Sequence, residues 1–130
     1  MFDEKLAKRR LKRLITLTKY EALYRRKLDF SLTFDNLWSL LVKQNYQCAL
    51  TGWTLEYTSG GNFDRRNPVG CTIDRIDNSK GYVQDNVQLV CCIVNITRSK
   101  LEINQFVDLC QAVARTADLT KNSQFAIINT

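Results

Sequence analysis

The sequence predicts a small α+β protein in which helices flank a β-hairpin, and three observations predict it. The chain has 130 residues, the usual size of a single domain. Apolar residues recur at helical spacing towards both ends of the chain, whereas its middle alternates short apolar runs with turn residues. Hydrophobic residues make up 45% and charged residues 25% of the composition, and these proportions are typical of a globular protein.

A long basic helix is predicted at the N-terminus, over residues 3–28. Ala7 and Leu14 belong to an apolar stripe at helical spacing, while lysine and arginine side chains occupy another face. Tyr20 and Tyr24 continue the stripe at four-residue spacing. We therefore expect these two tyrosines to be packing residues.

Two further helices follow from the same pattern. One begins at Thr33, a good N-cap residue, and the other covers residues 102–117. The side chains expected to be buried are Phe34, Leu37, Trp38, Leu41 and Val42 in the first of these helices, and Ile103, Phe106, Leu109, Cys110 and Val113 in the second.

Between these helices the chain carries the signals of turns and short strands. Residues 46–73 contain a polar loop with adjacent glycines and the only proline, and end in a short apolar stretch. Residues 86–94 indicate a strand that runs into the start of a helix. The tail, residues 119–130, has weak patterning and is expected to form a loop and a short strand at 125–128.

The positive charge is concentrated at the N-terminus. The net charge is +6; residues 1–30 contain ten Lys or Arg and four Asp or Glu, and the other hundred residues contain nine of each. Such a block indicates a nucleic-acid or anionic-membrane partner, and the alternative is a solvated face that only aids solubility. We expect residues 1–30 to be a basic extension that binds such a partner and residues 31–130 a single compact domain. The side chains of this extension that would contact the partner are Lys8, Arg9, Lys12, Arg13 and Lys19.

The residues that the sequence lacks exclude several functional classes. No apolar run reaches the roughly 18 residues of a membrane helix, and the basic N-terminus lacks the apolar stretch of a secretory signal. We therefore expect a cytoplasmic protein. Without histidine, Ser-His-Asp and Cys-His catalytic systems are excluded, and a metal ion is the simplest remaining way to activate water.

The five cysteines, an odd number with irregular spacing, are expected to be reduced thiols.

Three sequence blocks carry a resemblance to a known family. They are Cys48-Ala-Leu-Thr51-Gly52, then Asp74-Arg75-Ile76-Asp77 followed by Gly81-Tyr82 and Asn86-Val-Gln-Leu-Val90, and finally Cys91-Cys-Ile-Val-Asn95-Ile-Thr-Arg98. In their order and spacing these blocks resemble the HNH (ββα-metal) nuclease family, in the form common among phage-encoded proteins, over roughly residues 33–113. The resemblance implies a ββα-metal core with flanking helices and a divalent-metal-dependent DNA endonuclease or nickase of a bacterial or phage-infected host cell. It makes DNA the expected partner of the basic extension, residues 1–30.

The resemblance also implies a role for each polar residue. Asp74 and Asn95 would bind Mg²⁺ or Mn²⁺, because two oxygen ligands plus water suit a hard cation. Asn86 would hold the hairpin loop through backbone hydrogen bonds. Arg75 occupies the position of the general-base histidine, where arginine cannot accept a proton at neutral pH, so Asp77 is the nearest alternative base or second ligand. Water bound to the metal could also serve unaided, and Arg75 could instead stabilise the charge of the transition state. The residues placed to bind phosphates are Arg75, Arg98 and Lys100.

The departures from the family pattern leave alternatives open. Only Cys48 and Cys91 remain at the family's cysteine positions, so a structural zinc ion is not expected and the cysteines are read as small buried apolar residues. The missing base allows a catalytically degenerate HNH-fold DNA-binding protein without cleavage activity. A protein-interaction module whose basic helix binds an acidic partner is a third possibility. The oligomeric state is left open, with a dimer as one alternative.

Overall fold

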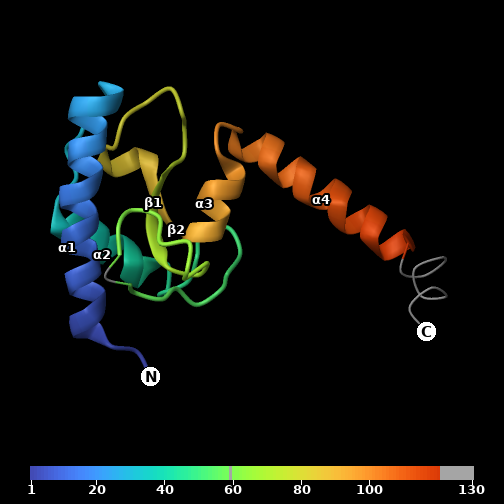
Figure 1. Ribbon diagram of the computed structural model, residues 1–130, viewed down its shortest axis with the longest axis horizontal. Coiled ribbons are helices and arrows are strands. Elements are labelled where there is room, and N and C mark those ends of the chain that lie inside the picture. Colours follow the sequence, from blue (N-terminus) through green and yellow to red (C-terminus); the bar gives the residue numbers. More distant parts are fainter. Residues whose placement is uncertain (59, 121–130) are drawn as a thin grey trace. The chain divides into compact units, whose positions relative to one another are not determined.

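The computed structural model describes residues 1–58 and 60–120, and its fold class is α+β, as the sequence predicts (Figure 1). Contacts divide the described chain into two units, residues 1–99 and residues 100 onward. The described elements, in chain order, are α1 (Glu4–Tyr20), the π-helix η1 (Glu21–Arg26), α2 (Phe34–Lys43), β1 (Cys71–Arg75), the 3-10 helix η2 (Gln84–Asn86), β2 (Val87–Cys91), α3 (Cys92–Arg98) and α4 (Ile103–Thr120).

The sheet is a hairpin that leads directly into a helix. β1 and β2 pair antiparallel, in a register that runs from Cys71 opposite Cys91 to Arg75 opposite Val87. α3 starts at the residue that follows β2, so the predicted strand running into a helix at 86–94 is confirmed (Figure 1). Every residue of β1 except Arg75 is buried, because α1 and α3 both contact this strand.

The N-terminal helix is shorter than the sequence suggests. Asp3 caps α1 by accepting a 3.0 Å hydrogen bond from the Leu6 N–H, and after Tyr20 the chain becomes a π-helix that ends at Lys27 with φ 56°. A π-helix takes more residues per turn, so the apolar stripe does not continue into it. Tyr20 and Tyr24 are accordingly 58% and 68% exposed and contact each other, with ring centroids 5.4 Å apart. Their predicted place on the buried stripe is wrong.

The core of the first unit lies between α1, α2 and the hairpin, which contact one another. Its buried apolar side chains are Ala7, Leu11 and Leu14 of α1, Leu37 and Leu41 of α2, and Ile73, Leu89 and Val90 of the hairpin. Each buried leucine contributes about 1.5–3 kcal/mol relative to an exposed one. α1 is therefore part of the core as well as the carrier of the basic block.

α2 begins where the sequence predicts. Thr33 Oγ1 accepts a 3.1 Å hydrogen bond from the Asn36 N–H, and Asn36 Oδ1 accepts one of 3.0 Å from the Thr33 N–H, which forms a capping box. Of its predicted buried side chains, Leu37 and Leu41 are buried, Phe34 and Trp38 are half-buried, and Val42 is exposed. The Lys8 ammonium group lies 5.0 Å from the centroid of the Trp38 ring, and that of Lys12 lies 5.3 Å from the centroid of the Phe34 ring. The rings therefore border the charged surface instead of filling the core.

α4, in the second unit, is predicted at 102–117 and observed at Ile103–Thr120. Phe106 is buried, as expected. Three other side chains that were expected to be buried are exposed: Leu109, Cys110 and Val113. Helical spacing identifies an apolar face but not what covers it, and these predictions are wrong for that reason.

The predicted strand at 125–128 lies outside the described residues. Among the helices that the structure describes, none is both long and apolar enough to cross a membrane.

Candidate functional site

A buried ion pair links the hairpin to α3. Arg98, the last residue of α3, donates a 2.6 Å hydrogen bond to Asp74 Oδ2 on β1, and the two side chains are 1% and 7% exposed. Gln88, opposite Asp74 in the hairpin, donates to the same oxygen at 3.0 Å. Burial raises the pKa of Asp74 above its ordinary value, while the hydrogen bonds from Gln88 and Arg98 oppose this effect. Asp74 is therefore a carboxylate held inside the unit by two donors.

The Arg98 guanidinium also binds the chain that follows β1. It donates to the carbonyl oxygens of Arg75 at 2.6 Å and Ile76 at 3.1 Å, and to Asn78 Oδ1 at 3.4 Å. A guanidinium bonded in this way inside the unit is not at the surface where a phosphate would bind. The structure thus differs from the predicted phosphate contact of Arg98, because Asp74 and the end of β1 take up its donors. Lys100, predicted for the same role, is exposed.

Asn95 lies one turn before Arg98 on α3 and is bonded to the same strand. Its side-chain amide donates to Thr72 Oγ1 at 3.1 Å and to the Ile73 carbonyl oxygen at 3.0 Å. These bonds hold the amide nitrogen against the strand. The structure therefore brings the two predicted metal ligands, Asp74 and Asn95, to adjoining positions of β1 and α3.

Asn86 holds the loop between β1 and β2. Its Oδ1 accepts a 2.8 Å hydrogen bond from the Asp77 N–H, and its side-chain amide donates to the carbonyl oxygens of Asp77 at 3.0 Å and Gly81 at 2.9 Å. Its own carbonyl oxygen accepts from the Ile76 N–H at 2.8 Å. Asn86 is 5% exposed, so these bonds replace water for a buried amide. Asn86 therefore makes the backbone hydrogen bonds that the sequence analysis expects of the residue that holds the hairpin loop.

Arg75 and Asp77 are engaged within the same loop. The Arg75 guanidinium donates to two loop carbonyl oxygens, at 2.7 and 2.9 Å, and lies 5.5 Å from the centroid of the Tyr82 ring. Asp77 Oδ1 accepts hydrogen bonds from the Ser79 hydroxyl at 2.7 Å and the Ser79 N–H at 2.9 Å. These bonds lower the pKa of Asp77, the hydroxyl bond most of all. A carboxylate with a lowered pKa is a weaker base, which makes Asp77 a poor replacement for the missing histidine.

The polar groups around Asp74 do not form a complete divalent-cation site. Asp74 and Asn95 offer one carboxylate and one amide, and their oxygens are of the kind that Mg²⁺ prefers. Arg98 already balances the charge of that carboxylate, and its fixed positive charge would repel a metal ion bound beside it. Among residues 1–58 and 60–120, no three His, Cys, Asp or Glu side chains are grouped so that they could hold a metal ion. The arrangement does not fit the Mg²⁺ or Mn²⁺ that the resemblance implies.

Exposed cations of α1 lie on a face of the helix turned away from the core. These cations are Lys5, Arg9, Lys12 and Lys19, and the buried residues of the opposing face are Ala7, Leu11, Leu14 and Thr18. Of the other predicted DNA contacts, Lys8 lies 3.8 Å from Glu4, and Arg13 donates to the Gly60 carbonyl oxygen at 3.2 Å. Of the outer-face cations, Lys12 lies over the Phe34 ring, so the side chains with most freedom to meet a partner are Lys5, Arg9 and Lys19.

Arg10 belongs to the same basic block but is buried, at 2% exposure. It donates to the carbonyl oxygens of Cys71 at 3.2 Å, Gly60 at 2.9 Å and Asn62 at 3.2 Å, and so fastens a long loop and β1 to α1. Counting Arg10 with the other basic residues of the N-terminal block gave no sign that it fastens the loop to α1. Its position on the face that carries Ala7 is the signal that could have revealed it.

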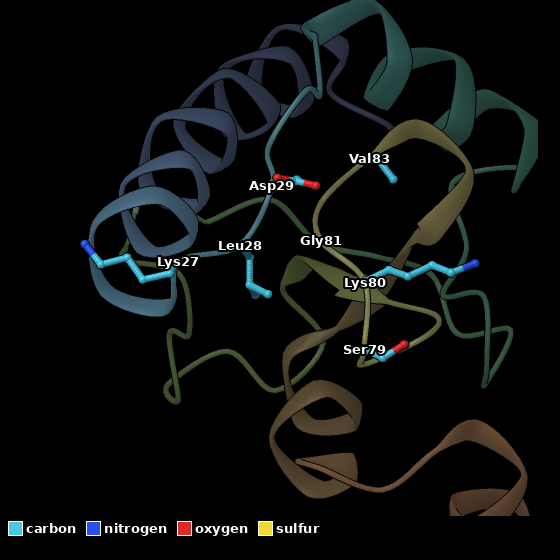
Figure 2. Close-up of a pocket in the computed structure, with 7 residues that line it drawn as sticks. All are labelled: Lys27, Leu28, Asp29, Ser79, Lys80, Gly81 and Val83. Atoms are coloured by element: carbon cyan, nitrogen blue, oxygen red, sulfur yellow. The ribbon is translucent and has the colours of Figure 1, made fainter.

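An open cavity of about 440 Å³ adjoins the end of η1 and the loop before η2, and no sequence pattern predicted it. Its lining residues are Lys27, Leu28, Asp29, Ser79, Lys80, Gly81 and Val83 (Figure 2). Gly81 lets the two segments approach, because a Cβ there would overlap the Asp29 carbonyl oxygen. Lys27 and Lys80 point away from each other in Figure 2, so their charges do not converge on one ligand.

Comparisons of the chain with protein-family profiles, with curated proteins and with solved structures give no match.

Proposed function

We propose that this protein binds DNA through the outer face of α1, by contacts to the phosphodiester backbone that do not read the base sequence. The observation that carries the proposal is a row of exposed cations on one face of a helix whose other face is built into the core: Lys5, Arg9, Lys12 and Lys19. Contacts between Lys or Arg and phosphates supply most of the affinity of non-specific DNA binding.

The length of this face suits a nucleic-acid backbone. From Lys5 to Lys19 the helix rises about 21 Å, at 1.5 Å per residue. A DNA strand carries one phosphate about every 3.4 Å along the duplex axis, so the face spans the axial rise of roughly six phosphates, and each of its four cations can contact one of them. Because buried residues fix α1 in the core, little conformational entropy is lost when the helix meets DNA.

In this proposal the HNH-like hairpin and helix form a scaffold and perform no catalysis. Asp74, Asn86 and Arg98 are engaged in hydrogen bonds that join β1, the hairpin loop and α3. The absence of histidine from the sequence agrees with this role, since the general base of the family has no equivalent here.

Two variants of equal charge test the proposal. Each replaces three exposed cations by glutamine and lowers the net charge by the same amount. One carries Lys5→Gln, Arg9→Gln and Lys19→Gln on α1, and the control carries Lys43→Gln, Arg65→Gln and Lys80→Gln elsewhere on the first unit. Fluorescence anisotropy with two unrelated DNA duplexes should show that the α1 variant loses about tenfold or more in affinity for both. The control should lose less than about threefold.

Equal losses in the two variants would mean that only the net charge matters and would contradict a binding face on α1. A loss confined to one duplex would contradict backbone binding, because phosphate contacts carry no sequence information.

Cleavage of the bound strand is a second candidate function. The observation that favours it is that Asp74 and Asn95 lie on adjoining positions of β1 and α3, since these are the two residues that the resemblance implies as metal ligands. Supercoiled plasmid incubated with Mg²⁺ or Mn²⁺, against an EDTA control, separates the two functions. The scaffold proposal predicts no nicking. Metal-dependent nicking that is lost in Asn95→Ala and kept in the matched variant Asn104→Ala would establish cleavage instead.

A further inference from the structure

Two exposed tyrosines lie side by side where α1 ends. Tyr20 is the last residue of α1, and Tyr24 belongs to η1, which continues α1 without a break (Figure 1). Their ring centroids are 5.4 Å apart with an angle of 41° between the ring planes, and more than half of each residue is exposed. Leu23, which lies between them in the sequence, is also exposed. Exposed apolar side chains gathered in one patch are typical of a surface that meets a partner.

The backbone that carries the tyrosines is held in place, so their exposure is not that of a frayed helix end. Ala22 is fully buried, and its carbonyl oxygen accepts a 2.7 Å hydrogen bond from the Leu28 N–H. The chain then turns at Lys27, with φ 56°. Short π-helical segments are rare and are frequently found at functional sites. Because η1 is fixed, little conformational entropy is lost when a ligand stacks on the two rings.

The charge around the tyrosines is positive. Residues 19–27 contain four Lys or Arg and a single acid, Glu21, which is paired with Arg25 at 3.1 Å. Lys19, Arg26 and Lys27 are exposed. Aromatic rings among cations suit a ligand that carries both planar groups and negative charge, and a strand of nucleotides carries both.

The tyrosine patch continues the cationic face of α1. Tyr20 lies eleven residues after Arg9, which is about three helical turns, so the two side chains lie on the same side of the helix. It lies nine residues after the buried Leu11, about two and a half turns, and therefore on the side opposite the core. The rise from Arg9 to Tyr20 is about 16 Å. One strand a few nucleotides long can thus contact the cations and the rings together.

The aromatic pair of α2, which also borders the basic block, is less open to a ligand. Phe34 and Trp38 stack on each other with ring centroids 6.2 Å apart, and both are half-buried. The ammonium groups of Lys12 and Lys8 already lie near these two rings. A base would have to displace the ammonium groups before it could stack, so the tyrosines are the better candidates.

We propose that Tyr20 and Tyr24 are a binding site for the unpaired bases of single-stranded DNA, which stack on the two rings while the cations of α1 and η1 bind the phosphates of the same strand. Within a duplex the bases stack on one another, so only unpaired bases offer their faces to a tyrosine ring. The proposal rests on the DNA binding proposed for α1 and adds to it a contact that duplex DNA does not make.

Fluorescence anisotropy with the full chain tests the proposal on two probes, a single strand of about twelve nucleotides and the duplex of the same sequence. Tyr20→Ala with Tyr24→Ala should lower the affinity for the single strand by about tenfold or more, since the loss of one stacked ring costs about five- to hundredfold. Its affinity for the duplex should change by less than about threefold. Tyr20→Phe with Tyr24→Phe keeps both rings and should bind both probes within about threefold of the unsubstituted protein.

Trp53→Ala with Phe63→Ala is the matched control, because it removes two exposed rings elsewhere in the first unit and leaves the net charge unchanged. It should bind the single strand as the unsubstituted protein does. Equal losses in the control and in the tyrosine-to-alanine variant would overturn the proposal. An equal loss on both probes would overturn it too, as would a loss in the phenylalanine variant as large as that in the alanine variant.

Photo-crosslinking locates the contact without any substitution, and so decides even if the alanine variant fails to fold. A single strand that carries 5-iodouracil is irradiated in complex with the unsubstituted protein, which is then digested with trypsin. Tyr20 and Tyr24 lie together in peptide 20–25, where mass spectrometry should find the nucleotide adduct. An adduct confined to peptide 28–43, which contains Phe34 and Trp38, or to peptide 44–65 would overturn the proposal.

The stacking site and the cationic face of α1 fail in different measurements. The variant with Lys5→Gln, Arg9→Gln and Lys19→Gln tests the phosphate contacts on the duplex, to which the tyrosines contribute little. A loss there, with unchanged single-strand affinity in the tyrosine-to-alanine variant, would overturn the stacking site alone. No loss there, with a loss of single-strand affinity in the tyrosine-to-alanine variant, would overturn the cationic face of α1 alone.

Discussion

Asp74 shows how this protein keeps a charge inside its first unit. Arg98 and Gln88 both donate to Asp74 Oδ2, and the Arg98 guanidinium also binds carbonyl oxygens at the end of β1. Removing one partner of a buried ion pair costs about 3–5 kcal/mol, because the other charge is left unpaired. Replacing both partners by apolar groups costs less. The ion pair therefore stabilises the fold only while both Asp74 and Arg98 are present.

We predict that Asp74→Ala lowers the free energy of unfolding by about 3 kcal/mol. The double variant Asp74→Leu with Arg98→Met should lose less than Asp74→Ala does. Urea unfolding of the three proteins measures these differences, with the exposed Asp85→Ala as a control that should change stability by less than about 0.5 kcal/mol. Equal stability of Asp74→Ala and the control would mean that the ion pair contributes nothing to the fold.

Asp64 gives a pH-dependent prediction. Hydrogen bonds from Arg66, above all, and from Thr58 lower its pKa to about 2. A carboxylate with a lowered pKa in the folded state stabilises that state fully above its unfolded pKa, and this stabilisation is lost as the pH falls through about 2. Asp64→Asn should therefore lower the melting temperature at pH 7. The difference from the unsubstituted protein should shrink as the pH falls from about 4 towards 2, and thermal scans along that series check it. A difference that stays constant with pH would contradict the prediction.

Single residues were predicted from the sequence with mixed success, for a physical reason. Asn86 was expected to hold the hairpin loop, and its hydrogen bonds to Asp77 and Gly81 are in place, because loop residues near in sequence bond locally. The pairing of Asp74 with Arg98 was not predicted. The spacing of residues on a strand and a helix does not say which side chains meet when the two pack together.

At the scale of the elements, α1 serves two surfaces at once. Its apolar stripe packs against α2 and β1, and its outer face carries the exposed cations. Helical spacing predicted α1, α2 and α4, and Thr33 predicted where α2 starts. The π-helix after Tyr20 was missed, because residue periodicity does not register a change in helix type. The burial of Arg10 was missed because its charge was counted with that of its neighbours.

Adjacent arginines of α1 should behave in opposite ways. Arg10→Ala removes three buried or partly buried hydrogen bonds to loop and strand carbonyl oxygens, of which, among the described residues, only that of Gly60 keeps a second donor, Arg13, so we expect it to lower the free energy of unfolding by about 2–4 kcal/mol. Arg9→Ala, on the exposed face, should change stability by less than about 0.5 kcal/mol. Urea unfolding of the two variants makes the comparison. A similar small effect for both would show that Arg10 does not fasten the loop.

At the scale of the whole molecule, the α+β class and the order of the elements were predictable from composition and periodicity. The exposed apolar side chains of α4 were not, since Leu109 and Val113 follow a pattern that only a covering partner would bury. The charge distribution was predictable in outline: the +6 net charge comes from the N-terminal segment. Which of its cations face outward became clear only from the packing of α1.

The salt dependence of DNA affinity tests the central claim most directly. The logarithm of the association constant should fall linearly with the logarithm of salt concentration, with a slope of about −0.9 for each phosphate contact. The variant with Lys5→Gln, Arg9→Gln and Lys19→Gln should show a slope shallower by about 2.7, while the variant with Lys43→Gln, Arg65→Gln and Lys80→Gln keeps the original slope. An unchanged slope in the α1 variant would contradict the claim that α1 binds the DNA backbone.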